Sequence, residues 1–447
     1  METKEMNQDL FKLINWQMTF KVVVIGAITI ALLVPKFMIL GLINERAQTA
    51  ETSQKEVMQK WSLEQTVRGP VLSIPYIDLT YDKNNKPEGE EVRSFYILPS
   101  VLKVDGQITP QKLYRSIYQS VVYESVINVA GNFDAVDFES LKIDPKDILW
   151  DKAKILVAIN DLRGINNRVS LSWNGHNYTF LPGMDNELVG SNGISLPLNG
   201  LSASDFPGTF QFTLNLKGSG SLQFAPLGET TEVNLQSTWN DPGFEGSFLP
   251  ADRTISKNGF TAHWKILNFN RNFPQEWKNE AYHVTNTDFG VRLVNMAGHY
   301  QKCLRTAKYG ILVILFVFLS FFLNEIITKQ RIHPFQYILV GFAILIFYLL
   351  LLSISEQLGY NFAYLIAAVS VIVMVFAYSR TFLDKWSNSV MLTSILTFAF
   401  GFIFVLMQLE SYALLVGSIG LFCVLALTMF FTRKINWYNE QKDPELK

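Results

Sequence analysis

Two regions of the chain are dense in apolar residues, and the long stretch between them is not. The first is 22–42, VVVIGAITIALLVPKFMILGL, and the second is 309–432. A helix needs about 20 mostly apolar residues to cross the hydrocarbon core of a bilayer. The pattern predicts one transmembrane helix at 21–43 and a five-helix block over 306–432. The five spans are placed at 308–327, 335–354, 361–379, 389–409 and 412–431.

Pro35 and Lys36 interrupt the first span without excluding it. A lysine side chain can reach the membrane interface, and proline is tolerated in membrane helices. A cleaved signal peptide is the alternative interpretation. It fits less well, because the apolar run resumes after Lys36 and no A-x-A cleavage pattern follows.

Basic residues in the short segments indicate the orientation of the helices, because Lys and Arg concentrate on the cytoplasmic side. The segments that contain them are 1–20, 328–334, 380–388 and 433–447. The segments without them are 353–361 and 408–411. Both termini are therefore expected in the cytoplasm, as tails 1–20 and 433–447, and residues 44–305 in the periplasm.

The region between the apolar segments begins like a helix and continues like a series of strands. Residues 44–67 contain no Gly or Pro, and Val57, Met58 and Trp61 form a stripe at helical spacing, which predicts a helical stalk. From Arg68 onward, short runs of β-branched and aromatic residues alternate with polar ones between turn residues. The predicted fold class is an integral membrane α-helical protein with six spans, one plus five. It carries a large extracytoplasmic antiparallel β-rich domain, a sandwich or a pair of packed sheets.

The charge of the chain argues against nucleic acid as a partner. The formal net charge is −1, and residues 44–305 contain 25 Lys and Arg against 29 Asp and Glu. Neither value gives the basic surface that binds nucleic acid or other phosphates. The partners expected are membrane lipids and an unidentified envelope component or protein, and the oligomeric state is left open.

Several motifs of common enzymes do not occur in the chain. H-E-x-x-H, G-x-S-x-G and the P-loop are all missing from the sequence. His176, His263, His283 and His299 match no metal-ligand spacing and are interpreted as surface or partly packed residues. We therefore expect a protein that is not an enzyme and has no cofactor.

Two local motifs stand out in the β-rich region. In NDLRG, residues 160–164, Asp161 can cap a turn, Arg163 can pair with a carboxylate or bind an anion, and Gly164 permits a positive φ. A structural turn is favoured over a binding site. The glycine-rich stretch 218–233 continues as a strand and is predicted to be a hairpin or a bulge, because a phosphate-binding loop would lead into a helix.

Acidic residues at the ends of the spans are the remaining candidates for chemistry. Glu356 falls near the C-terminal end of the third span, where the helix dipole disfavours an anion. It is either a solvated loop acid or a contact for the outer domain or an envelope ligand. Glu410 lies in the tight turn between the last two spans, and Glu325 is suitably placed to pair with Lys329.

The segment KQRIHPFQY, 329–337, connects the second and third spans. Its basic residues favour the cytoplasmic side, Pro334 suits the first turn of a helix, and its aromatic residues suit the interface. Anchoring of the helix does not require His333, which therefore stays a candidate functional contact.

Several stretches together resemble the CreD family of bacterial inner-membrane proteins. They are 331–368, RIHPFQYILVGFAILIFYLLLLSISEQLGYNFAYLIAA, with TRKINWY (432–438), RGPVLSIPY (68–76), NDLRG (160–164) and FEGSFLPADRTISKNGFTAHW (244–264). The resemblance implies a role in cell-envelope integrity. The family's founding members belong to the regulon of a two-component system that responds to envelope or metabolic stress, and altered colicin tolerance and links to β-lactam response go with it. It implies no catalytic residue or cofactor.

We expect a non-enzymatic inner-membrane protein that supports envelope integrity and stress response, with a periplasmic domain that binds an envelope component or a partner protein. The alternative is a protein that handles envelope lipids or glycans, as a transport component or a membrane enzyme, with Glu356, Glu410 and Arg163 as its candidate residues. A sensor that signals inward is a third alternative. It would need a partner, because only short connectors and a short tail face the cytoplasm.

Overall fold

The structure is a computed structural model, and it divides the chain into two compact units. The membrane unit contains Met1–Thr49 and Ala297–Lys447, and the β domain contains Ala50–Met296. The described residues are 16–81, 87–136, 138–184, 188–279, 281–284, 286–293, 298–328, 331–383, 385–409 and 412–433. Glu410 and Lys329, which the sequence predictions include, lie outside these ranges.

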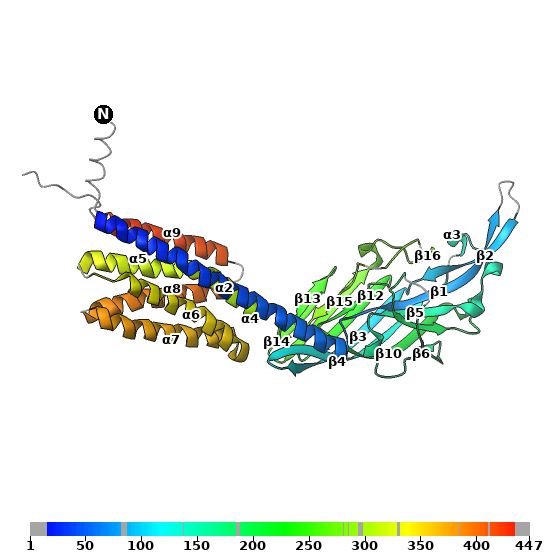
Figure 1. Ribbon diagram of the computed structural model, residues 1–447. Coiled ribbons are helices and arrows are strands. Elements are labelled where there is room, and N and C mark those ends of the chain that lie inside the picture. Colours follow the sequence, from blue (N-terminus) through cyan, green and yellow to red (C-terminus); the bar gives the residue numbers. More distant parts are fainter. Residues whose placement is uncertain are drawn as a thin grey trace, which may run out of the picture. The chain divides into compact units, whose positions relative to one another are not determined.

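Helices from both ends of the chain build the membrane unit. They are α2 (Trp16–Trp61, of which the part to Thr49 belongs here), α4 (Gly298–Lys308), α5 (Gly310–Thr328), α6 (Pro334–Leu358), α7 (Tyr360–Phe382), α8 (Trp386–Gln408) and α9 (Ala413–Thr432). Figure 1 shows them as a bundle of elongated helices. Their apolar sequences explain this arrangement, because a helix that is apolar all round must be buried in lipid or in protein.

Five helices among the described residues are long and apolar enough to cross a membrane: one near the N-terminus and four near the C-terminus. The sixth predicted span coincides with α9, whose described apolar part, Leu415–Phe430, is shorter. The predicted count of six is therefore approximate. The predicted class, a helical membrane protein with a large sheet domain, is confirmed.

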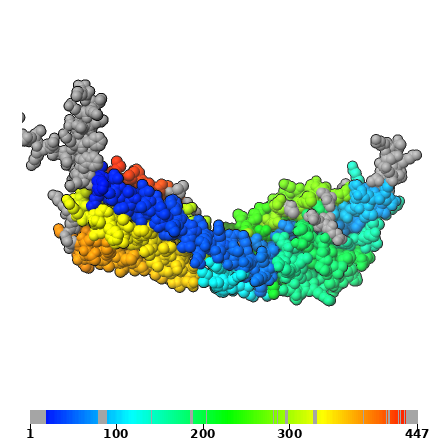
Figure 2. Space-filling view, in the orientation of Figure 1, coloured from blue at the N-terminus to red at the C-terminus, as the bar shows by residue number. Residues whose placement is uncertain are grey.

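Helix α2 packs directly against the C-terminal helices of the membrane unit. The Leu32 side chain lies over Gly341 of α6, where a Cβ atom would overlap it. Lys21 forms an ion pair with Glu325 of α5 and donates a hydrogen bond to the carbonyl oxygen of Ile332 at 2.9 Å. In Figure 2 the blue N-terminal residues accordingly lie beside the yellow residues of this unit. Among the described residues Glu325 therefore pairs with a residue of the first span, and its predicted partner Lys329 lies outside them.

Lys36 is buried inside the membrane unit, with 8% of its surface exposed. Its Nζ lies 3.4 Å from the carbonyl oxygen of Lys308, the last residue of α4. The last carbonyl groups of a helix lack partners within the helix and carry partial negative charge. Lys36 thus complements the end of α4, a role that its position beside Pro35 did not indicate.

Two sheets make up the β domain, as the alternating pattern predicts. The first, with nine strands in the described residues, contains β1 (Gln65–Tyr81), β2 (Pro87–Ile97), β5 (Lys154–Ile159), β8 (Leu181–Pro182), β9 (Gly193–Pro197), β11 (Ser221–Phe224), β13 (Gly243–Gly246), β16 (Glu276–Lys278) and β17 (Phe289–Arg292). The second, with eight, contains β3 (Val101–Arg115), β4 (Tyr118–Phe133), β6 (Ser170–Trp173), β7 (His176–Thr179), β10 (Gly208–Ser219), β12 (Thr230–Ser237), β14 (Asp252–Ser256) and β15 (Gly259–Leu267).

Strand pairing in both sheets is largely antiparallel. Parallel pairs occur between β1 and β11 and between β3 and β12. The order of the eight-stranded sheet is β14-β15-β12-β3-β4-β10-β6-β7. Short helices lie in the connections: α3 (Phe138–Leu141), η1 (Pro145–Asp147), η2 (Trp150–Lys152), η3 (Leu162–Gly164), η4 (Ala203–Asp205) and η5 (Asn268–Asn270).

Side chains from both sheets contribute to one apolar core, in which Tyr123, Phe133, Trp264 and Phe289 are almost completely buried. Along β3 as far as Thr109 and along most of β10, buried residues alternate with exposed or half-buried ones, because successive side chains of a strand point to opposite faces. The outer face of the eight-stranded sheet is therefore polar and open to solvent. This face carries the groove described below.

The prediction of a hairpin or bulge at 218–233 is wrong. Strand β10 pairs with β4 in the eight-stranded sheet, and β11 pairs with β1 and β17 in the nine-stranded sheet. The chain changes sheets at Gly220, whose φ of +68° is unfavourable for other residues. This glycine permits a crossover between the two sheets.

Candidate functional site

Asp161 of the NDLRG motif lies at the centre of a polar cluster in the β domain and is 7% exposed. Its Oδ2 accepts hydrogen bonds from the backbone N–H of Leu63 at 2.9 Å and from Ser62 Oγ at 3.2 Å. The Arg163 guanidinium donates to both carboxylate oxygens, at 2.9 Å from Nε and 2.7 Å from Nη2. Both oxygens are therefore fully used within the protein.

Arg163 and Gln65 connect this carboxylate to the end of helix α2. Arg163 Nη1 donates to the carbonyl oxygen of Gln59 at 2.7 Å, in the last turn of α2. The Gln65 side chain is completely buried, and its Nε2 donates to the carbonyl oxygens of Asp161 and Lys217. We call Gln59, Ser62, Gln65, Asp161 and Arg163 the junction cluster. It fixes the point at which α2 ends and β1 begins.

The electrostatics of the junction cluster follow from these contacts. The Arg163 hydrogen bonds, with the backbone N–H groups of Leu63 and Arg163, lower the pKa of Asp161 to about 2 against the opposing effect of its burial. The carboxylate raises the pKa of Arg163 in turn. The contacts of Asp161 and Arg163 thus account for a structural role of the motif, and a ligand contact of either residue stays a prediction.

Gly164 is needed in this motif for a different reason from the expected one. Its φ is not positive. A Cβ atom there would overlap the carbonyl oxygen of Lys217 and would lie 2.5 Å from Gln65 Nε2 and 2.9 Å from Ser62 Oγ. Glycine is therefore required because β10 and the junction cluster approach its Cα closely.

Glu356 lies in the last turn of α6 and is half-buried. Its Oε1 accepts a hydrogen bond of 3.0 Å from Tyr300 Oη on α4, and the His299 ring packs against the Tyr300 ring at 4.1 Å. The two chain segments are therefore tied at this end of the membrane unit. The arrangement places a carboxylate, a phenol and an imidazole close together.

Two further contacts continue along the same face of α4. Cys303 Sγ lies 3.4 Å from Ser355 Oγ, and Thr306 Oγ1 lies 2.8 Å from Tyr360 Oη. Tyr300, Cys303 and Thr306 are spaced at three residues and share one side of the helix. The contact with Ser355 on this side of α4 accounts for the burial of Cys303. Cys423, on α9, is exposed.

His333 is the N-cap residue of α6. Its Nδ1 accepts a hydrogen bond of 3.2 Å from the backbone N–H of Phe335, and Gln336 Oε1 accepts one of 2.9 Å from the backbone N–H of His333. Pro334 occupies the first turn, as predicted. These contacts explain the presence of His333 by its role as the cap of α6. A further functional contact of its side chain stays a prediction.

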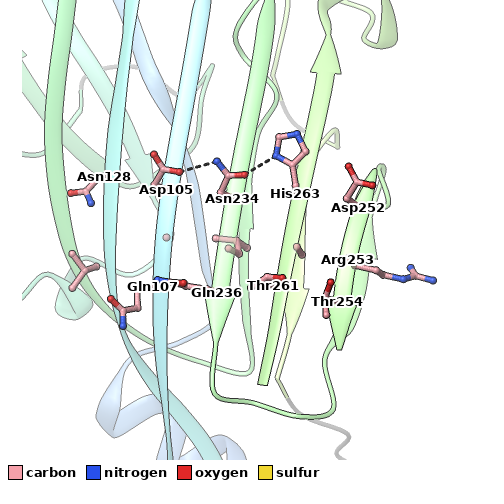
Figure 3. Close-up of a pocket in the computed structure, with 14 residues that line it drawn as sticks. Asp105, Gln107, Asn128, Asn234, Gln236, Asp252, Arg253, Thr254, Thr261 and His263 are labelled. Carbon is pink, nitrogen blue, oxygen red and sulfur yellow. Dashed lines mark hydrogen bonds between the residues drawn. The ribbon is translucent and has the colours of Figure 1, made fainter. Parts of the chain in front are cut away.

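A polar row that the sequence reasoning missed crosses the outer face of the eight-stranded sheet. Thr213, Asn128, Asp105, Asn234, His263 and Asp252 stand opposite one another on β10, β4, β3, β12, β15 and β14. Figure 3 shows the last five across their strands. Asn234 Nδ2 donates to Asp105 Oδ1 at 2.8 Å, and His263 Nδ1 lies 2.7 Å from Asn234 Oδ1.

The hydrogen bonds determine which nitrogen of the His263 ring donates and which accepts. A carboxylate can only accept, so the amide nitrogen of Asn234 faces Asp105 and its oxygen faces His263. Nδ1 of His263 must then donate, which leaves Nε2 of the neutral ring as an acceptor. The row therefore has a defined polarity from Asp105 to His263.

The helices and sheets together define a multi-pass membrane protein with one large extramembrane β domain. The family model described as Inner membrane protein CreD matches residues 17–438. The Inner membrane protein CreD of Escherichia coli (strain K12) is 34% identical over 427 residues, which cover 95% of this chain and 93% of the relative. The chain belongs to the CreD family of inner membrane proteins, and the resemblance seen in its sequence is confirmed.

Proposed function

We propose that this protein supports the integrity of the cell envelope without catalysis, as a membrane-anchored binding protein. The β domain would bind an envelope component or a partner protein. The observation that carries this proposal is the outer face of the eight-stranded sheet, where rows of polar side chains are exposed on aligned strands. Such a face is suited to recognition, because its donors and acceptors are only partly used within the protein.

The proposal includes an orientation with both termini in the cytoplasm and the β domain in the periplasm. It rests on the basic residues of the short segments, among them Arg331 and Arg380. A chain with Cys303→Ala and Cys423→Ala allows single cysteines to be tested at Lys103 in β3 and at Arg331, both of which are exposed. In intact spheroplasts a membrane-impermeant maleimide should label Lys103→Cys and spare Arg331→Cys. If only Arg331→Cys were labelled, the protein would have the opposite orientation to the one proposed.

The cluster of Glu356, Tyr300 and His299 favours a second candidate function, the handling of envelope lipids or glycans. A carboxylate beside a phenol and an imidazole could exchange protons with a bound polar group. The binding-protein proposal instead assigns Glu356 a tie between α4 and α6. The two candidates differ in what happens when the carboxylate is removed and the hydrogen bond is kept.

Glu356→Gln is expected to retain envelope resistance, since glutamine can still accept from Tyr300. Resistance is measured as the detergent concentration that stops growth of a strain whose own copy has been deleted and replaced by the variant. We expect a value within about twofold of wild type, as for the control Gln357→Ala, an exposed neighbour. Complete loss with Glu356→Gln at normal abundance would support the catalytic alternative. Unchanged resistance in the deletion strain itself would refute the envelope role.

A further inference from the structure

The outer face of the eight-stranded sheet is hollowed along its strands. One hollow of about 400 Å³ is lined by the row containing Asp105, Asn234, His263 and Asp252. A second, of about 330 Å³, extends toward Thr109, Thr238 and Ser256. Both are lined by Gln107, Gln236, Thr254 and Thr261. The two hollows are therefore one elongated groove, which we call the sheet groove.

Three rows of side chains at two-residue spacing form the floor of the sheet groove. The first contains Asp105, Asn234 and His263, the second Gln107, Gln236 and Thr261, and the third Thr109 and Thr238. Alternate residues lie about 6.8 Å apart along a strand, so the three rows extend over about 14 Å. Figure 3 shows the first two rows. A groove of this length suits an extended ligand with repeated units.

The chemistry of the sheet groove is mostly that of neutral amides and hydroxyls. Asn, Gln and Thr side chains can both donate and accept, and His263 Nε2 adds an acceptor. Hydroxyl groups of a ligand can likewise both donate and accept. The groove therefore matches a ligand that carries many hydroxyl and amide groups and little charge.

The charges in the sheet groove disfavour an anionic ligand. Asp105 and Asp252 line it, and neither is in an ion pair within the described part of the chain. Arg253 also borders it, but its guanidinium stacks 5.7 Å from the Phe244 ring and points away in Figure 3. Two carboxylates outside any ion pair among the described residues repel phosphate groups, so nucleic acids and anionic headgroups fit poorly.

We infer that the sheet groove binds a glycan chain of low net charge, such as a polymer of N-acetylated sugars. This inference rests on the proposed function and names the envelope component that the β domain recognises. A cationic peptide is the other ligand that two carboxylates could attract. The glycan is favoured because the second and third rows contain no acidic residue that a peptide's cations could pair with.

The test uses the full-length protein in lipid nanodiscs and the β-1,4-linked tetramer of N-acetylglucosamine, with insoluble peptidoglycan sacculi as a second probe. Binding is measured by calorimetry and by co-sedimentation. Asn234→Leu and His263→Leu each remove partners from the first row and should weaken binding about tenfold. Gln211→Leu, on β10 of the same exposed face but outside the groove, is the matched control and should bind like wild type.

Salt distinguishes the two ligand classes. Glycan binding should change little between about 0.05 and 0.5 M salt, because it involves few charges. The inference is overturned if neither probe binds, if the three variants bind alike, or if only Lys-rich peptides bind and salt releases them. If the protein binds neither glycan probe but the deletion strain is sensitive to detergent, the glycan inference is refuted and the envelope role stands. If the protein binds the glycan but the deletion strain is fully resistant to detergent, the glycan inference is supported and the envelope role is refuted.

Discussion

Asp161→Ala is expected to lower the free energy of unfolding of the β domain by about 3 kcal/mol. The substitution removes the acceptor for Arg163, for Ser62 Oγ and for the backbone N–H of Leu63. Ser62 is completely buried, so its hydroxyl loses a partner that water cannot replace. Urea unfolding of the full-length protein in detergent, followed by near-UV circular dichroism, measures the change.

The pH dependence of this effect has a definite sign. The pKa of Asp161 is lowered to about 2 in the folded protein, against about 3.9 in an unfolded chain. Its contribution, about 2 kcal/mol, is present above pH 4 and is lost as the pH falls from 4 toward 2. The stability difference between wild type and Asp161→Asn should shrink over that interval. A difference that is constant from pH 7 to pH 2 would contradict the ion pair.

A control separates this effect from a general loss of surface charge. Asp252 is exposed on the edge strand β14 and lies outside every ion pair among the described residues. Asp252→Asn should leave the unfolding midpoint unchanged within about 0.5 kcal/mol. Hydrogen exchange should then show faster opening near Leu63 and Gln65 in Asp161→Ala only. That pattern would locate the effect at the end of α2.

The spans and the class of the β domain were predictable, because each depends on local sequence. A bilayer imposes a run of about 20 apolar residues, and a half-buried strand imposes alternation. The ion pairs formed within the membrane unit were less predictable. Lys329 was the nearest cation along the chain to Glu325, whereas the cation that pairs with it in the structure, Lys21, lies 304 residues away.

The polar row of the sheet groove shows why a binding surface is harder to predict than a fold. Asp105 and Asn234 are 129 residues apart, and Asn234 and His263 are 29 apart. Asp105 and Asn234 are ordinary exposed positions on their strands, and His263 is half-buried. They become neighbours only through the register of three strands, and a shift of one residue would turn them to the other face. The alternation of polar and apolar residues was visible in the sequence, but the pairing of the strands was not.

The NDLRG motif was recognised as a turn, but its glycine was explained by the wrong constraint. That glycine permits a positive φ is a general property of the residue and can be applied from the sequence alone. The approach of β10 to the Cα of Gly164 cannot be inferred in this way, because that strand lies about fifty positions further along the chain. A long-range contact was therefore mistaken for a local preference.

Gly164→Ala is accordingly expected to destabilise the β domain by about 3 kcal/mol. The added methyl group would overlap the carbonyl oxygen of Lys217 and press on the buried side chains of Gln65 and Ser62. Overpacking of a well-packed site usually costs about 1–3 kcal/mol, and a backbone neighbour puts this position at the upper end, since it cannot rotate away. Urea unfolding of the full-length protein measures the loss.

Gly243→Ala provides the matched control in the same domain. At Gly243 the nearest atoms to a Cβ would be Arg292 Cβ at 3.7 Å and Arg292 oxygen at 3.8 Å, which is ordinary contact, and no positive φ is required. We expect this variant to unfold within about 0.5 kcal/mol of wild type. Equal effects of the two substitutions would mean that glycine acts at both positions through the unfolded chain. A loss confined to Gly164→Ala would instead establish close approach as the reason that NDLRG ends in glycine.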